Sequence, residues 1–380
     1  MKKMKFDHLT YYIKHKISPV GQNIFNKKKH FQRRESLYNH LGITKKTLSN
    51  LEILEVGPAE GHNAAYLASC NPKILHLVEP NPNANKNIFK IFKKLKVSIK
   101  KTKIIKQKFE DFNLKKKYDL VICEAWLGIN KKERRLVAKL GTLVKNNGIL
   151  IITSSSSISF LSNIIRRFIG LSLTAKITDF NKKTNYLVKF YKDHLKTMKN
   201  MSCPYKDWVQ DCLIGAGFLN IHPNPQEIFK DLGKKFNFYN SYPKFYNDWR
   251  WYKDLINDQF DAKDNFLDQY NKNSHNFIDY KFLFPEIQTD QNIKLSYKSR
   301  ELLNLLIQNE NALNPKNYKL FLNKLVEINN LLKSNKIILK GIDEVIDILR
   351  KKNFLRVSKL KYFKANFGRE LFYISLIKNL

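Results

Sequence analysis

Short apolar runs alternate with amphipathic segments between residues 51 and 154, and this alternation constrains the fold more than any other feature of the chain. The apolar runs are LEILEVG, ILHLVEP, TKIIKQK, YDLVICEA and ILIITS, and the helix-like segments run through AAYLASC, NANKNIFKIFKKL and KKERRLVAKLGTLV. Strands that alternate with helices of about ten to fifteen residues form parallel βαβ units in one sheet. We therefore predict an α/β fold, with a Rossmann-like, doubly wound and mostly parallel sheet in residues 49–157.

The rest of the chain is divided around this core. Residues 1–48 read as a helical leader or lid, with a break at Ser18-Pro19 and a helix stop at Gly42. Residues 158–340 read as a large, mostly helical insertion or cap. Residues 341–380 hold an amphipathic helix and two β-rich runs, LRVSKLKYF and ELFYISLIK, around a turn at 366–368. An antiparallel C-terminal hairpin is predicted there, which covers the apolar edge of the parallel strands and brings the sheet to seven strands.

Composition limits the function classes. The net charge is +36 over 380 residues, and of the 69 basic residues 58 are Lys and only 11 are Arg. RNA-reading surfaces usually gather Arg and aromatic side chains in one place, so a diffuse coat of solvated lysine is favoured over a nucleic-acid interface. The start is basic without a signal-like apolar segment, and nowhere do about 18 apolar residues run together, so no membrane span and a cytoplasmic location are expected.

The four cysteines, Cys70, Cys123, Cys203 and Cys212, show neither a CxxC spacing nor a Cys/His ligand spacing. We expect them to be reduced and structural, and no metal site is predicted.

The turn after the first apolar run is the strongest candidate for chemistry. Gly57 and Gly61 follow a run that ends in the carboxylate Glu55, and a second carboxylate, Glu79, ends the next run. In an open α/β sheet the ligand lies beyond the carboxyl ends of the strands, where the first turn lets it approach the backbone. Glu55 suits a cationic or amine-bearing ligand rather than a pyrophosphate, and Glu79 lies where an acid accepts both hydroxyls of a ribose. The alternatives for the turn are a purely structural bend and an NAD site, although the GxGxxG pattern is missing, and the alternative for Glu79 is an ordinary helix-capping acid.

These residues resemble the class I S-adenosylmethionine-dependent methyltransferases, whose first motif is an acid followed by spaced glycines and whose second strand ends in an acid. The matching stretches are EVGPAEG (55–61), VEP with Glu79 and Pro80, YDLVICEAWLG, and LVKNNGILIIT. The resemblance implies S-adenosyl-L-methionine as the cofactor, with its methionine portion at Gly57, Pro58, Ala59 and Gly61 and its ribose at Glu79. Ala59 replaces the family's middle glycine. Phe109 and Glu110, in KQKFEDF, would lie beside the adenine; Phe109 as plain core is the alternative.

The end of the fourth strand is the place where such folds face the transferred methyl group. Glu124 is the candidate catalytic residue, as a group that orients or deprotonates the acceptor, and Glu124 and Ala125 are also expected beside the cofactor. Trp126 is assigned to the acceptor pocket, with core packing as an equal alternative. Methyl transfer is an in-line displacement that needs positioning and desolvation, so no obligatory catalytic motif is expected.

Two further stretches are candidates for acceptor binding. KKHFQRRE brings His30, Arg33 and Arg34 onto about one helical turn, where they could bind an anionic group or act as a lid, the alternative being a solvated basic face. FYNSYPKFYNDWRWYKD crowds aromatic side chains around Arg250. We expect Trp249 or Trp251 to line the cleft that faces the glycine turn, while a packed cap core is the alternative; burial of all three residues 249–251 is not expected, because Arg250 needs a partner or water.

The sequence as a whole favours a methyltransferase acting on a small molecule or a surface-glycan sugar. An RNA or DNA methyltransferase is the alternative supported by charge, and a cofactor-binding protein without turnover is the alternative suggested by Ala59. The sequence does not indicate an oligomeric state.

Overall fold

The computed structural model describes residues 8–18, 21–127, 131–215, 223–308, 315–332 and 335–379. The chain forms two compact units, each built from distant segments. The sheet unit comprises Tyr12–Ser155, Asn220–Tyr270 and Leu371–Leu380. The helical unit comprises Met1–Tyr11, Ser156–Leu219 and Asn271–Glu370.

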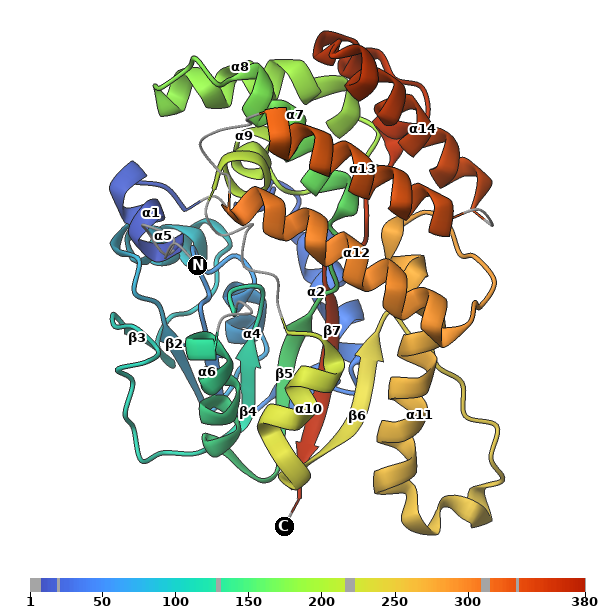
Figure 1. Cartoon of the computed structure of the whole chain (residues 1–380). Coiled ribbons are helices and arrows are strands. Elements are labelled where there is room, and N and C mark those ends of the chain that lie inside the picture. Colours follow the sequence, from blue (N-terminus) through green and yellow to red (C-terminus); the bar gives the residue numbers. More distant parts are fainter. Residues whose placement is uncertain are drawn as a thin grey trace. The chain divides into compact units, whose positions relative to one another are not determined.

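A seven-stranded sheet in the order β3-β2-β1-β4-β5-β7-β6 forms the centre of the sheet unit. Its strands are β1 (Glu52–Val56), β2 (Ile74–Val78), β3 (Thr102–Ile105), β4 (Tyr118–Cys123), β5 (Val144–Ser154), β6 (Phe236–Tyr242) and β7 (Phe372–Lys378). The first five are parallel, whereas β7 runs antiparallel to both β5 and β6. Figure 1 shows β4 and β5 in the middle of the sheet, and β3 and β6 at its two edges. The predicted fold class is confirmed.

Helices cover the sheet where the 3.6-residue pattern predicts them. Those of the sheet unit are α2 (Lys27–His40), α3 (Lys45–Leu48), α4 (Ala64–Ser69), α5 (Pro82–Lys94), α6 (Lys131–Thr142), α10 (Pro225–Leu232) and all but the last turn of α11 (Asp258–Asn273). The apolar faces of α2 to α5 and the strands make one core, in which Ile53, Leu77 and Phe92 are almost fully buried. Burial of such side chains stabilises the unit by about 1.5–3 kcal/mol each. α2 ends at His40, and Gly42 follows in the left-handed conformation with φ +82°, as the helix-stop prediction requires.

The antiparallel strands differ from the prediction in one respect. The run LRVSKLKYF is not a strand, because it forms 3₁₀ turns over Phe354–Lys359 and at Phe363. The carboxylate of Glu344 accepts the backbone N–H groups of Lys361, Tyr362 and Phe363 at 3.1, 2.9 and 2.9 Å, so these donors are unavailable to a strand ladder. The partner of β7 is instead β6, from the segment predicted to be helical cap.

The segment Asn220–Tyr270 belongs to the sheet unit for a further reason. Arg134 of α6 donates to both carboxylate oxygens of Asp231 on α10, at 3.0 and 2.7 Å. Such a bidentate pair fixes orientation as well as distance. The two units therefore do not follow the predicted division at 157 and 340: part of 158–340 builds the sheet, and 341–370 belongs to the helical unit.

The helical unit holds α7 (Leu161–Leu173), α8 (Phe180–Leu195), α9 (Tyr205–Trp208), α12 (Thr289–Gln308), α13 (Pro315–Leu331) and α14 (Lys336–Lys351), while α1 (His8–His15) spans the boundary between the units. Arg166 of α7 is fully buried, with its guanidinium 3.8 Å from the ring centroid of Phe367 and 4.6 Å from that of Phe363. It donates to the carbonyl oxygens of Phe363 and Lys364 at 3.1 and 3.3 Å. These contacts give the buried guanidinium hydrogen-bond acceptors and two aromatic ring faces.

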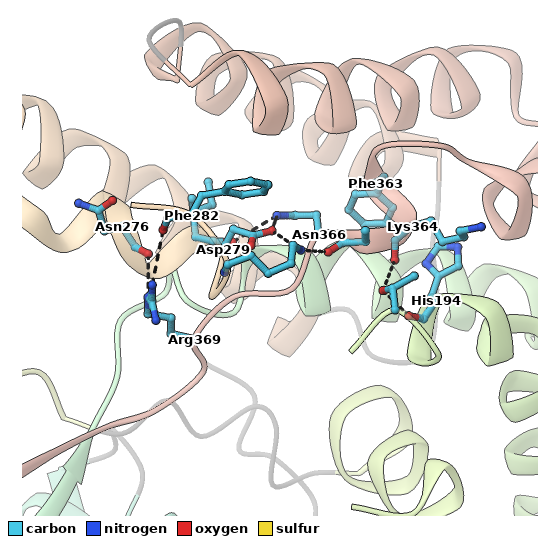
Figure 2. A network of polar contacts seen from close by, with 12 residues as sticks. His194, Asn276, Asp279, Phe282, Phe363, Lys364, Asn366 and Arg369 are labelled. Atoms are coloured by element: carbon cyan, nitrogen blue, oxygen red, sulfur yellow. Dashed lines mark hydrogen bonds and ion pairs between the residues drawn. The ribbon is translucent and has the colours of Figure 1, made fainter. Parts of the chain in front are cut away.

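Polar contacts tie the segment after α14 to the rest of this unit (Figure 2). Asn366 donates to the Asp279 carboxylate at 2.9 Å, and Lys281 pairs with the same carboxylate at 3.0 Å. Arg369 donates to the carbonyl oxygen of Asn276 at 3.3 Å. Asp279 is 1% exposed, so its bonds are shielded from water and hold the segment firmly.

None of the helices in the described ranges is both long and apolar enough to cross a bilayer.

Candidate cofactor-binding and active site

The turn between β1 and α4 has the backbone geometry that its glycines allow. Gly57, Ala59 and Gly61 all lie in the left-handed region, with φ of +74°, +49° and +79°. Two hydrogen bonds close the turn: the Gly57 N–H donates to Val78 O and the Gly61 N–H to Pro58 O, both at 2.9 Å. Ala59 thus takes the conformation that a glycine would take, at a backbone cost of about 1–2 kcal/mol.

Glu79 follows β2 directly and reaches the turn. One carboxylate oxygen accepts the Ala59 N–H at 2.9 Å, and the other accepts the Asn81 N–H at 2.7 Å. The side chain is 6% exposed, and burial raises the pKa of Glu79 to about 7 although both backbone hydrogen bonds oppose the shift. The predicted pair of features, a glycine turn and an acid at the end of the second strand, is therefore in contact.

Trp126 lies on the turn. A Cβ built on Gly57 would stand 2.5 Å from the Trp126 Cδ1, so only glycine permits this contact. The Trp126 ring also meets Phe109 edge to face, with 6.0 Å between centroids, and Phe109 stacks on Phe112. Phe109 is 2% exposed, while Trp126 is half-buried. The structure thus brings together two residues that the sequence assigned to adenine and acceptor.

A buried ion pair lies at the end of β4. Both Nη atoms of Arg34 donate to the two carboxylate oxygens of Glu124, one of them at 3.1 Å, and the side chains are 8% and 9% exposed. Asn63 donates to Glu124 at 3.3 Å, and Arg34 donates to the Tyr38 hydroxyl at 3.1 Å. The interpretation of a solvated basic face is wrong for Arg34. The sequence grouped Arg34 with His30 and Arg33 as a candidate for an anionic group, and the structure pairs it with the carboxylate of Glu124. Its spacing of four from Tyr38 on a helix was the signal for the second contact.

Glu55 is the most perturbed acid of the site. It is 3% exposed, and its Oε2 accepts no hydrogen bond from any residue in the described part of the chain. Burial, followed by repulsion from Glu124, raises the pKa of Glu55 to about 8, so the carboxyl group keeps its proton at neutral pH. An amine-bearing ligand would supply the missing donor.

His30 connects α2 to the glycine turn. Its Nε2 lies 2.8 Å from the carbonyl oxygen of His62, the residue after Gly61, and the side chain is 4% exposed. Burial lowers the pKa of His30, which holds the ring neutral. The solvated reading is therefore wrong for His30 as well. Arg33, one position before Arg34, is half-buried.

The remaining predicted cofactor residues lie around the same turn and strand ends. Pro58 is buried and Pro80 is half-buried. Ala125 has φ +59°, and its N–H donates to the Thr153 hydroxyl at 2.8 Å. Glu110 is exposed, and its carbonyl oxygen accepts from Lys139 at 2.8 Å. Their predicted roles remain predictions.

The segment with Trp249, Arg250 and Trp251 lies elsewhere in the sheet unit. Trp249 is 92% exposed, Trp251 is 58% exposed, and Arg250 pairs with Asp248, so the expectation that the trio is not buried is confirmed and the cap-core alternative is wrong. In Figure 1 the chain between β6 and α11 descends along the β6 edge of the sheet, on the far side of β6 from β1 and β4. This position gives the predicted acceptor role no support.

The residues present fit an S-adenosylmethionine-like ligand. Glu79 offers buried carboxylate oxygens for hydroxyls, and Glu55 Oε2 is an acceptor in need of a donor. Within the described ranges no group of His, Cys, Asp or Glu side chains could hold a metal ion.

Comparison with known proteins gives the same answer for the first half of the chain. Residues 9–196 match a family model described as a methyltransferase domain. Residues 9–196 belong to this methyltransferase family. The resemblance predicted from the sequence is thereby confirmed, and with it the class of cofactor, S-adenosyl-L-methionine.

Several solved structures of low sequence identity are similar to parts of this chain. PKMT2 from Rickettsia typhi is 13% identical over 63% of this chain and 49% of that protein, with a TM-score of 0.42. A putative methyltransferase from Thermoplasma acidophilum is 20% identical over 28% of this chain and 44% of that protein, with a TM-score of 0.24. The N-methyltransferase NodS from Bradyrhizobium japonicum is 17% identical over 36% of this chain and 74% of that protein, with a TM-score of 0.29. The chain thus spans less than half the length of the first two. No curated protein matches it.

Proposed function

We propose that the protein transfers a methyl group from S-adenosyl-L-methionine to a small molecule or to a sugar of a surface glycan. The observation that carries the proposal is the contact between the left-handed glycine turn and the buried carboxylate of Glu79. The cofactor supplies a methyl group already activated by a sulfonium. The chain's own residues then have to bind, orient and exclude water.

Each part of the site has a task in this proposal. The Gly57–Gly61 turn holds the methionine portion, and Glu55 receives its ammonium group. Glu79 accepts hydrogen bonds from the ribose hydroxyls. The apolar surfaces of Phe109 and Trp126 exclude water beside the turn.

Glu124 orients the acceptor in this proposal. Its oxygens already accept hydrogen bonds from Arg34 and Asn63, which fixes the carboxylate in one position. A carboxylate held in one position in this way is suited to orient an acceptor.

A nucleic-acid acceptor is the second candidate, and the net charge of +36 favours it. Three of the 11 arginines argue against it, because Arg34, Arg166 and Arg167 are at most 6% exposed and so cannot bind a phosphate at the surface. Retention of RNA that falls steeply with salt would support this candidate. A cytoplasmic location is part of the main proposal, since all four cysteines are free, as in a reducing compartment.

Calorimetry with S-adenosylhomocysteine tests the proposal. Glu79→Ala should weaken binding by about 1.5–3 kcal/mol, the range for a hydrogen bond to a charged group. Glu60→Ala is the matched control, because Glu60 lies on the same turn but its carboxylate accepts from Asn87 at 2.8 Å. Heat with NAD and none with S-adenosylhomocysteine would overturn the proposal.

A further inference from the structure

Residues 247–255, which we call the aromatic loop, expose several large apolar side chains. Trp249, Trp251, Tyr252 and Leu255 are 92%, 58%, 70% and 39% exposed. Trp and Tyr usually bury most of their rings in a folded domain, and contiguous exposed apolar groups mark interaction sites. The glycine turn and its cofactor do not account for this surface.

The start of the aromatic loop is fixed to the sheet unit. Just before it, Phe245 packs against Phe266 of α11 and Phe372 of β7, with ring centroids 5.3 and 6.0 Å apart. The Asn265 side chain on α11 then donates to the carbonyl oxygen of Asn247 at 3.1 Å. From there the chain continues along the outer side of α11 toward the start of that helix (Figure 1). The exposed rings are thus presented from a fixed base at the β6 edge of the sheet.

Cationic groups accompany these rings. The Lys253 ammonium lies 4.8 Å from the Trp251 ring centroid and 5.8 Å from that of Tyr252. Arg250 pairs with Asp248, and Lys244 is exposed just before the loop. The whole chain adds a net charge of +36, which attracts any anionic surface over several ångströms.

We propose that the aromatic loop docks the protein on a membrane surface that carries anionic lipids. Trp and Tyr rings prefer the interface between headgroups and acyl chains, because their bodies are apolar and their tips are polar. Stable peripheral binding needs both an inserted apolar element and electrostatic attraction, and the loop together with the lysine-rich chain supplies both.

Single-stranded nucleic acid is the competing occupant, and the geometry favours it less. Bases stack on open ring faces, but Lys253 lies over the rings of Trp251 and Tyr252. The Lys253 ammonium can bind a lipid phosphate at the headgroup level from this position. The edges of the two rings can then contact the acyl chains below it.

Vesicle sedimentation with the full chain tests this proposal without any cofactor. The protein should bind vesicles of phosphatidylcholine mixed with phosphatidylglycerol, and bind phosphatidylcholine alone weakly. Replacing Trp249 and Trp251 together by Ala should lower the partition coefficient on the order of tenfold or more, since two exposed rings are lost. Both side chains are exposed, so circular dichroism should show a folded variant. Phe89→Ala is the matched control, because Phe89 is an exposed ring (52%) on α5 of the same unit.

Each outcome decides the matter. Tenfold weaker binding of the double variant, with wild-type binding of the control and quenching of wild-type tryptophan emission by brominated lipid, supports the proposal. Equal binding of the double variant shows that diffuse lysine charge alone holds the vesicles and overturns it. Weak vesicle binding together with retention of single-stranded RNA that depends on Trp249 and Trp251 overturns it in favour of nucleic acid.

Discussion

Binding of S-adenosylhomocysteine at pH 7 is expected to release protons from Glu55 and Glu79. Both carboxyl groups are buried, with pKa values raised to about 8 and about 7. The ligand's ammonium and hydroxyl groups favour the ionised carboxylates, so binding lowers both pKa values. At pH 7 a group of pKa about 8 is about nine-tenths protonated and one of pKa about 7 is about half protonated, so release should lie between about one and one and a half protons per site.

Calorimetry at one pH in buffers of different ionisation enthalpy measures this number directly. The Glu55→Gln variant should release about half a proton per site on binding, and the Glu79→Gln variant about nine-tenths of a proton. Because the ionised forms bind the ligand, affinity should rise as the pH increases from 6 to 9. Binding that releases no protons, with unchanged values in both variants, would refute the assignment of these two acids while leaving cofactor binding intact. An absence of binding heat would instead count against the proposed function.

Three further outcomes follow from the same site. Arg34→Met should lower the free energy of unfolding by about 3–5 kcal/mol, because it strands the Glu124 charge, and adding Glu124→Leu should recover most of the loss in urea denaturation. Gly57→Ala should lower the free energy of unfolding by about 1–3 kcal/mol and weaken the binding of S-adenosylhomocysteine. Adding Trp126→Ala should restore part of the lost stability, because the clash disappears but the backbone strain at φ +74° stays. Between about pH 6.5 and 8, the unfolding free energy of wild type should fall more steeply with pH than that of Glu55→Gln, by up to about 1.4 kcal/mol per pH unit, because folded Glu55 keeps a proton that the unfolded chain has lost. An equal slope would remove Glu55 from the buried site.

The sequence alone determined the parallel part of the sheet and the identity of the turn. Residues 51–154 carry strong local periodicity, and each βαβ unit is encoded within a short stretch. Gly57, Gly61 and Glu79 were assigned to one place because the topology of such units brings the carboxyl ends of β1 and β2 together. These features depend on neighbours in the sequence, so a single chain suffices to find them.

Only the tertiary structure decided which segments close the sheet. β6 and β7 pair although more than a hundred residues separate them in the sequence. A short run such as FNFYNSY does not indicate which strand it will pair with. The run LRVSKLKYF has the composition of a strand, but Glu344 takes its backbone donors. Non-local hydrogen bonds overrode local preference here.

The same distinction holds in the site. Arg34 and Glu124 are 90 residues apart, and nothing in either local pattern indicates that their charges meet in a buried pair. Trp126 reads equally well as core or pocket, and its position over Gly57 comes from the arrangement of β1 beside β4. A residue's chemistry is written in the sequence, but its burial and its partner are properties of the packed fold, and these raise the pKa values of Glu55 and Glu79.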